Sequence, residues 1–451
     1  MTRLDDAAMQ RFVRDGYVVL KPGFSDEFNE TVRTNIDGVL ERYDNPRNNL
    51  LPHIPEIQDI FDHPVVDGAM ASILGDDYYL HLHRHIHGNA PGSPGQNMHK
   101  DSLQNSRFAV DDNRRHHHTR WAMAFYYPQD TPVEIGPTGV IPRSQYLNTR
   151  EPFEDADVMP VAGEAGTVCI VHYDLLHGAT PNTSEGKRHM VKFLFTRMSE
   201  PDTPSWNHGG ARWDASDDAQ KRTWEHLWHW HGGTNGAKPE PTRSVAELAT
   251  LLAGDSEPEG VDAAYQLGHA GEEAVPVLIE ALRGDSVAAR RNAGYAFTVT
   301  GPEAVEGLVD ASADEDAEIR ARAVDALGDM GENASDAIPA LVARLADESD
   351  IVRRHAAEAL GTTAQKTDAA TMPLAGMLTD ENDVVRRNAA LALARIGDRA
   401  AEAVPALIDA LREPHYYVRG FSVQALRRIA TPEATSGLLH YLEATRWDPA
   451  Q

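Results

Sequence analysis

Histidine and aspartate residues at two places in the chain have the spacing of a metal site. His99 and Asp101 are separated by one residue, so a strand, or the loop that leaves it, would direct both side chains to the same side. His177, far along the chain, fits as a third ligand on a strand that is adjacent in space. Two imidazoles and one carboxylate on one face of an octahedron leave three positions open, which is typical of non-haem Fe(II) oxygenases. We therefore predict that these three residues bind one ferrous ion.

The open positions of such an ion suit a bidentate keto acid and O2, and 2-oxoglutarate is the keto acid that this arrangement favours. Its distal carboxylate needs a cation, and Arg188 lies eleven residues after His177, beyond a turn at 181–186. An antiparallel return would bring Arg188 beside the metal strand, where a planar guanidinium can pair with a carboxylate through two hydrogen bonds. We therefore expect Arg188 to bind the cosubstrate.

A second His-x-Asp pair, His172 and Asp174, competes for the role of ligand. It lies so close to His177 that the three side chains would crowd one strand end, so we expect a structural role for it. A further run of histidines, 116–118, lies in the polar segment 111–119, for which we expect a lid or a solvated loop.

Four histidines alternate along the run 81–87 and would share one face of a strand. We expect this face to line the cavity, rather than to hold a second metal. At least one of its members is then placed to contact 2-oxoglutarate or substrate. The candidates are His83, His85 and His87, and we assign His83 to the cosubstrate.

Helices and strands must position these residues. Apolar residues at helical spacing predict a helix over 4–15 that ends at Gly16, and 17–20 reads as a short strand. Ser25 is a candidate cap for a second helix, and a third is expected at about 65–74. Strands are expected to begin after that helix.

The second half of the chain repeats a pattern of two amphipathic helices. Residues 274–282, 337–345 and 403–411 are similar copies of the first helix. The second helices carry a leading arginine at spacings of 30, 33, 33 and 33 residues: Arg290, Arg320, Arg353, Arg386 and Arg419. Such a repeat predicts an α-solenoid.

Two features of each repeat have structural interpretations. We expect the leading arginines to bond to neighbouring acidic side chains or loop carbonyls within the stack. Glycine ends helices, and we expect the second helix of a repeat to end at the following positions: Gly268, Gly331, Gly361 and Gly397.

Composition excludes several classes of partner. The 451 residues are 41% hydrophobic and carry a net charge of −27, which favours a multidomain protein without nucleic acid or anionic membrane as its main partner. The single cysteine, Cys169, lies in an apolar run and is expected to be a buried strand residue. The N-terminus has no apolar core of signal-peptide length, and no stretch reaches the roughly 18–20 apolar residues of a membrane span. A cytoplasmic protein is expected.

The first half resembles the phytanoyl-CoA dioxygenase family over about residues 5–230. The resemblance is carried by 15–20, His99 to Asp101, 136–144, and the stretch from His177 through Asn182 to Arg188. It implies a double-stranded β-helix (jelly-roll) domain in which His99, Asp101 and His177 are the iron ligands and Arg188 holds 2-oxoglutarate. Phe125 matches the place of an aromatic residue beside the cosubstrate.

The chain departs from the family pattern at two places. It has Pro142 to Gln145 where the family usually reads Pro-Gly-Ser-His, and Lys100 where the residue after the first ligand is often Gln. We expect both near the cavity mouth, so the family's usual substrates do not carry over. Asp101 is a carboxylate, whereas related halogenases lack one, so the resemblance favours hydroxylation of a small molecule, such as a secondary metabolite, with release of succinate and CO2.

The second half resembles HEAT-like repeats of the phycocyanobilin lyase type over about 243–445. From residue 241 onward there are 35 acidic and 19 basic side chains, a net charge of −16, so a basic or neutral protein surface is the expected partner. The predicted domains are 1–235, a linker at 236–242, and 243–451. Two alternatives stay open: a scaffold with a catalytically silent jelly-roll, and an oxygenase whose repeats recruit a carrier- or protein-bound substrate.

Overall fold

The computed structural model divides the chain into two compact units. It describes residues 2–43, 46–101, 116–150, 153–213, 220–234, 236 and 238–445, except for the side chains of Arg47 and His83. One unit comprises Met1–Ser216 and Leu227–Thr234, and the other comprises Asp217–His226 and Asn235–Gln451. The division falls inside helix α6 (Lys221–His231). The domain limits predicted from the sequence stay a prediction.

Helices α1 to α4 open the first unit. Helix α1 (Asp6–Asp15) begins where the Asp5 side chain accepts a hydrogen bond from the backbone N–H of Ala8, and it ends at Gly16, whose φ is +82°. Strand β1 (Tyr17–Leu20) follows, and then α2 (Asp26–Tyr43), where the Ser25 hydroxyl caps the first turn as expected. Helix α4 (Pro64–Leu74) confirms the third expected helix. Helix α3 (Glu56–Asp62) was not expected from the sequence.

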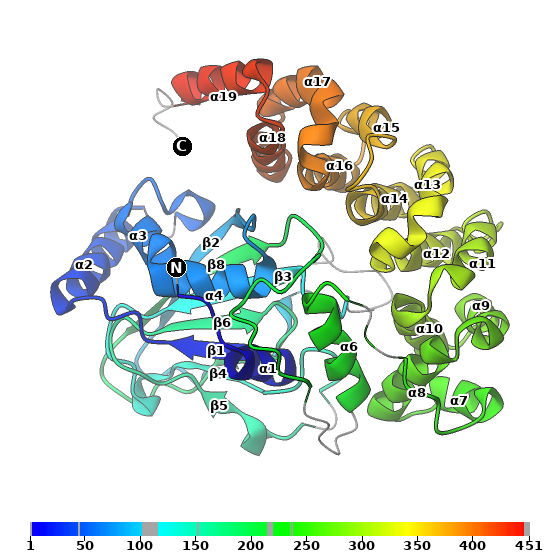
Figure 1. The fold of residues 1–451 in the computed structure, drawn as a ribbon. Coiled ribbons are helices and arrows are strands. Elements are labelled where there is room, and N and C mark those ends of the chain that lie inside the picture. The colour runs from blue at the N-terminus through cyan, green and yellow to red at the C-terminus, as the bar shows by residue number, and fades with distance from the viewer. Residues whose placement is uncertain are drawn as a thin grey trace. The chain divides into compact units, whose positions relative to one another are not determined.

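Two antiparallel sheets follow in the first unit, in agreement with the jelly-roll that the family resemblance implies (Figure 1). The larger has the strand order β1-β6-β3-β8-β2, and the smaller has the order β5-β4-β7. The strands beyond β1 are β2 (Tyr79–Asn89), β3 (Trp121–Tyr126), β4 (Thr138–Val140), β5 (Met159–Pro160), β6 (Val168–His172), β7 (His177–Ala179) and β8 (Arg188–Thr196). The central strand β3 pairs with β6 on one side and β8 on the other.

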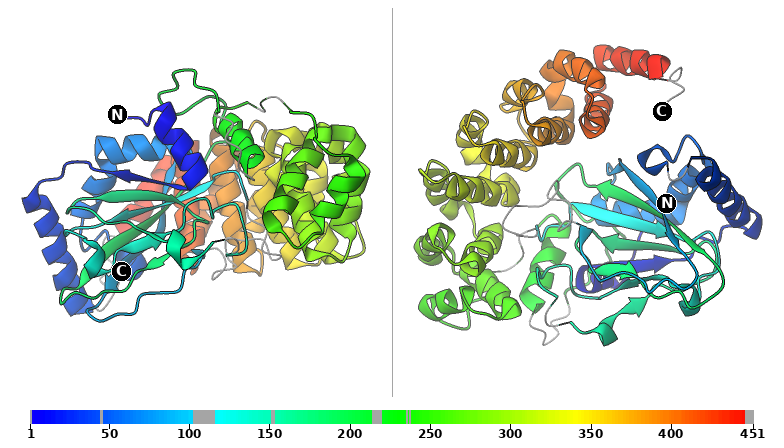
Figure 2. Two further views of the ribbon diagram at one scale, coloured as in Figure 1. Left: turned by 90° about the horizontal axis from the view of Figure 1, so that it is seen from below. Right: turned by 180° about the vertical axis from the view of Figure 1, so that it is seen from behind.

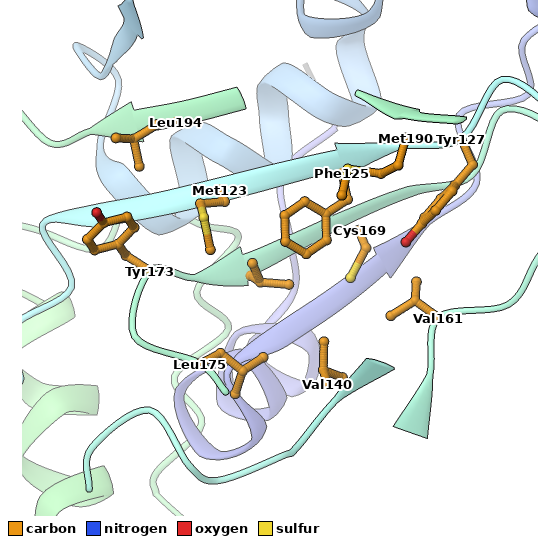
Figure 3. Packing of buried hydrophobic residues seen from close by; sticks show 11 residues of the cluster. Met123, Phe125, Tyr127, Val140, Val161, Cys169, Tyr173, Leu175, Met190 and Leu194 are labelled. Atoms are coloured by element: carbon orange, nitrogen blue, oxygen red, sulfur yellow. The ribbon is translucent and has the colours of Figure 1, made fainter. Parts of the chain in front are cut away.

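The space between the two sheets is filled by apolar side chains (Figure 3). Met123 and Phe125 of β3 and Cys169 of β6 come from the large sheet, and Val140 of β4 comes from the small one. Cys169 is fully buried, which confirms its predicted place in a buried strand. This apolar layer gives the two sheets a rigid support.

The second unit is all-helical and confirms the predicted repeat architecture (Figures 1 and 2). Its second helices, α8, α10, α12, α14, α16 and α18, pack each against the next. The helices are α7 (Val245–Leu252), α8 (Glu257–Ala270), α9 (Val275–Arg283), α10 (Val287–Val299), α11 (Val305–Ala311), α12 (Ala317–Asp329), α13 (Ile338–Arg344), α14 (Asp350–Thr363), α15 (Thr371–Met377), α16 (Asp383–Ile396), α17 (Val404–Asp409), α18 (Tyr416–Ile429) and α19 (Pro432–Thr445).

The leading arginines tie each repeat to the next, as expected. Arg353 donates to the Asp380 carboxylate at 2.8 Å and to the carbonyls of Asp347 and Glu348 at 3.0 and 3.2 Å. Arg320 makes the same set of contacts one repeat earlier, to Asp347 and to the carbonyls of residues 314 and 315. These arginines therefore stabilise the loops of the solenoid.

The prediction that glycine ends the second helices is correct for Gly397 and wrong for Gly268 and Gly361. Gly397 caps α16 with a φ of +70°, whereas Gly268 lies inside α8 and Gly361 inside α14. A Cβ on Gly268 would lie 2.5 Å from the carbonyl oxygen of Ala296, and one on Gly361 would lie 3.0 Å from the Cα of Ala392. The interior glycines therefore permit close packing of successive helices. Gly331 lies just after α12, beyond its cap residue Met330.

Among the helices of the described residues, none is both long enough and apolar enough to cross a bilayer.

Candidate metal centre

His99 and His177 are brought together by a direct backbone pair. The N–H of His99 donates to the carbonyl of His177 at 2.9 Å, and the N–H of His177 donates to the carbonyl of His99 at 3.0 Å. His177 opens β7, whereas His99 belongs to no longer strand and Asp101 already has helical backbone. Within the described segment 97–101, His99 and Asp101 therefore do not lie on a continuous strand. The isolated bridge between His99 and His177 holds these two residues side by side.

Both imidazoles have one ring nitrogen fixed by a backbone carbonyl. Nδ1 of His99 lies 2.8 Å from the carbonyl oxygen of Asn97, and Nδ1 of His177 lies 2.9 Å from that of Leu175. Because a carbonyl can only accept, Nδ1 carries a proton in each ring, so the neutral tautomer has its lone pair on Nε2. This is the arrangement that orients histidine as a metal ligand.

The carboxylate of Asp101 faces both free ring nitrogens. Its Oδ1 lies 3.8 Å from Nε2 of His99, and its Oδ2 lies 3.8 Å from Nε2 of His177. The three ligand atoms all lie within 4.8 Å of one another, and within the described residues no other such group of three occurs. Two neutral nitrogens and one carboxylate oxygen at this spacing fit a divalent cation of the Fe(II) type.

Burial sets the charge state of these ligands. It lowers the pKa of His177 to about 4, against the opposing effect of Asp101, so this ring is neutral near pH 7. Burial acts to raise the pKa of Asp101, but the ammonium of Lys192 and the ring of His177 outweigh it and hold that pKa well below its usual range. The site therefore offers neutral imidazole and ionised carboxylate, which are the metal-binding forms.

Lys192 is a member of the site that the sequence reasoning missed. Its side chain, 7% exposed, donates to Oδ2 of Asp101. It lies on β8 directly opposite Phe125 of β3 and His85 of β2. A lone lysine in a strand carries no motif, although its spacing of four from Arg188 places both on the same face of a strand.

Arg188 is almost completely buried, with 1% of its surface exposed. Its Nε donates to the carbonyl of Gly136 at 3.1 Å, and its Nη1 donates to the carbonyl of His87 at 3.2 Å. No carboxylate within the described ranges forms an ion pair with it. A buried guanidinium that has only carbonyl partners on the protein is well suited to an anionic ligand.

Asparagine side chains hold the loop that carries the partner of Arg188. Asn89 donates to the carbonyls of Gly136 and Thr180 at 2.9 and 3.0 Å, and Asn182 donates to the carbonyl of Asn89 at 3.0 Å. Gly136 has a φ of +69°, and a Cβ there would lie 2.3 Å from the Asn89 amide nitrogen. The position therefore requires glycine.

Phe125 and His83 are the two further residues predicted to contact the cosubstrate. The ring of Phe125 lies 5.7 Å from that of His177, centroid to centroid, so the structure places it beside the candidate ligands. The side chain of His83 lies outside the described residues, so its assignment stays a prediction. The pairing of β2 with β8 shifts register between Leu80 and Arg84, and the rings of His85 and His87 lie 4.9 Å apart, centroid to centroid. The expected face of four histidines stays a prediction, because the side chain of His83 lies outside the described residues.

Three expectations about the cavity mouth and its lid need correction. Lys100 is fully buried, because its ammonium donates to the carbonyls of Ser144 and Leu147 at 2.5 Å each. Gln145 is also buried and donates to the carbonyls of residues 13 and 14. Of the expected solvated loop, residues 111–115 lie outside the described residues. His117 and His118 are buried, and His118 stacks on Trp230 with ring centroids 4.4 Å apart.

Comparison with known proteins identifies both halves of the chain. Residues 8–190 match the phytanoyl-CoA dioxygenase (PhyH) family, and three overlapping stretches, 275–361, 305–380 and 370–451, match HEAT repeats. The resemblances stated from the sequence are thereby confirmed. No curated protein matched the sequence.

Several solved structures are similar to part of this chain at low identity. The non-heme alpha-ketoglutarate-dependent carbocyclase SnoK from nogalamycin biosynthesis is 18% identical, with a TM-score of 0.34, over 43% of this chain and 85% of its own. EctD from S. alaskensis with 2-oxoglutarate and 5-hydroxyectoine is 18% identical, with a TM-score of 0.36, over 44% and 77%. HygX from Streptomyces hygroscopicus is 17% identical, with a TM-score of 0.35, over 43% and 87%.

Proposed function

From the phytanoyl-CoA dioxygenase domain at residues 8–190 and the HEAT repeats that follow it, we propose that this chain is an Fe(II)- and 2-oxoglutarate-dependent dioxygenase. The observation that carries the proposal is the convergence of His99, Asp101 and His177, with each ring nitrogen Nδ1 fixed by a carbonyl. The bound iron would supply the activation of O2, coupled to conversion of 2-oxoglutarate to succinate and CO2.

The chain's own residues would bind and orient the reactants. His99, Asp101 and His177 would hold the ion, and three protein ligands would leave it able to bind the reactants. Arg188 binds the distal carboxylate of 2-oxoglutarate through its planar guanidinium. Phe125 and the apolar layer around it keep water away from the ion.

Hydroxylation of a small molecule is the reaction that the donor set favours. Related halogenases lack the carboxylate that Asp101 would supply to the ion, so transfer of halogen is disfavoured. The substrate is proposed to be a small organic molecule that binds beside the ion.

Anaerobic titration tests this proposal directly. Adding Fe(II) and 2-oxoglutarate to the full-length protein should produce a visible charge-transfer absorption band, and His99→Ala should remove it. A His208→Ala variant is a matched control, because His208 pairs with Asp6 away from the ligands. A wild-type protein that binds neither Fe(II) nor 2-oxoglutarate would instead support a scaffold with a silent jelly-roll.

The HEAT repeats support a second candidate, in which the oxygenase acts on a carrier- or protein-bound substrate that they recruit. The net charge of −16 from residue 241 onward favours a basic or neutral partner surface. Removing residues 243–451 should then raise KM for the bound substrate and leave kcat for the free small molecule unchanged. Circular dichroism of the shortened chain must show that the jelly-roll is still folded.

A further inference from the structure

The ammonium group of Lys192 is buried and forms an ion pair with Asp101. Its side chain is 7% exposed, and within the described residues the carboxylate of Asp101 is the anion that it contacts. The residues opposite it in the sheet are His85 and Phe125, neither of which carries negative charge. The charge of Lys192 is therefore balanced by Asp101 in the structure.

The same carboxylate is a ligand of the proposed metal centre. A divalent cation between His99, Asp101 and His177 would draw the negative charge of Asp101 to itself, because the ligand atoms lie within 4.8 Å of one another. In the proposed function the metal-binding carboxylate of 2-oxoglutarate and the carboxylate of Asp101 together balance the dication, so neither is left to balance the ammonium of Lys192. A buried charge without a counter-ion is strongly unfavourable, so Lys192 then needs a further anion.

Arg188 does not compete for that anion. Arg188 and Lys192 lie on the same face of β8, four residues apart, which is about 13 Å along a strand. In the proposed function Arg188 is occupied by the distal carboxylate of 2-oxoglutarate. Lys192 is at the other end, in contact with the ligand Asp101.

We propose that Lys192 binds a carboxylate group of the substrate when the metal centre is loaded, so that the substrate is a small organic acid. The inference rests on the proposed function and deepens it by naming the substrate class. The carboxylate anchors the molecule beside Asp101 and so holds a nearby C–H bond close to the ion. Lys192 is thus a specificity-determining residue.

Acetate is a probe for this site that does not require the natural substrate. The full-length protein is loaded with Co(II), which reports ligand binding through its visible absorption, and saturated with 2-oxoglutarate. Acetate should then change the spectrum, and the neutral isostere acetamide should not. In the metal-free protein, calorimetry should detect no acetate binding, because Asp101 already neutralises Lys192.

Variants separate Lys192 from direct binding of acetate to the metal. Lys192→Met should weaken acetate binding at least tenfold and keep the affinity for 2-oxoglutarate, and Lys192→Arg, which keeps the charge, should retain most of the acetate binding. Lys187→Met is the matched control, because Lys187 is an exposed lysine on the same hairpin, and it should behave as the wild type.

The outcomes distinguish this inference from the proposed function. Equal acetate affinity in wild type and Lys192→Met, or no spectral response to acetate in loaded wild type, overturns the assignment of Lys192 alone. A loss of 2-oxoglutarate affinity in Lys192→Met equal to its loss of acetate affinity also overturns it, since Lys192 would then serve the cosubstrate. Failure of the wild type to bind Co(II) overturns the proposed function itself.

Discussion

At the scale of single residues, the candidate centre depends on which atoms are left free. The carbonyls of Asn97 and Leu175 accept hydrogen bonds from Nδ1 of His99 and His177, which leaves Nε2 of each ring to face a metal ion. Asp101→Asn keeps the shape of the side chain and removes its negative charge. We expect this variant to lose Co(II) affinity by at least about tenfold, measured by absorption titration, with the fold unchanged by circular dichroism. Unaltered affinity would show that Asp101 is not a ligand.

Arg188 has a different role at the same scale. Because it is buried and has only carbonyl partners on the protein, Arg188→Ala should weaken 2-oxoglutarate binding by about 2–5 kcal/mol. The Fe(II) affinity should change little. Arg33→Ala is a suitable control, since Arg33 pairs with Glu30 on the surface of α2. Titration of the charge-transfer band measures both effects, and an unchanged 2-oxoglutarate affinity would contradict the assignment.

At the scale of elements, the loop before β4 positions Arg188 through one glycine. Gly136→Ala combines an unfavourable φ with a clash against Asn89, and should cost about 2–4 kcal/mol of unfolding free energy and weaken 2-oxoglutarate binding. Gly92→Ala separates the two causes, because Gly92 also has a positive φ, +74°, but nothing within 4 Å of its added Cβ. It should cost only about 1–2 kcal/mol and spare the cosubstrate. Equal effects in denaturant unfolding would refute the role of the clash.

The helices of the solenoid give a second pair of elements to compare. A Cβ on Gly328 of α12 would lie 2.8 Å from the Cα of Ala359 on α14, so Gly328→Ala should destabilise the repeats by about 1–3 kcal/mol. Gly376 of α15 has nothing within 4 Å, so Gly376→Ala should stabilise them by about 0.5–1 kcal/mol through helix propensity. Thermal unfolding followed by circular dichroism should move in opposite directions for the two variants. A shift in the same direction would mean that close packing is not what requires Gly328.

At the scale of the whole molecule, two compact units with separate cores should respond to separate changes. A hundredfold excess of Co(II) over its Kd should stabilise the first unit by about 2.7 kcal/mol. Arg353→Ala removes a part-buried ion pair with Asp380 and should cost the second unit about 1–3 kcal/mol. Scanning calorimetry should show that Co(II) stabilises the first unit by the same amount in this variant as in the wild type. Arg399 forms an exposed pair with Asp398, so Arg399→Ala should change neither the effect of Co(II) nor the stability of the second unit. A single transition that is shifted both by Co(II) and by Arg353→Ala would show that the units unfold as one.

Features that depend on local spacing could be predicted from the sequence. The separation of His99 and Asp101, the place of His177, and the period of the leading arginines are all visible in the chain, because strand and repeat geometry convert spacing into position. The solenoid could therefore be predicted from its repeat, whereas the jelly-roll was implied by the resemblance to the phytanoyl-CoA dioxygenase family.

The tertiary structure alone decided the features that depend on pairing between distant segments. Lys192 meets Asp101 because β8 lies beside the metal segment, and no local pattern marks that contact. Lys100 turned out to be buried because its ammonium meets two carbonyls more than forty residues away. Partners of a buried charge come from non-local packing, so the three candidate ligands could be predicted, whereas the cation that balances Asp101 could not.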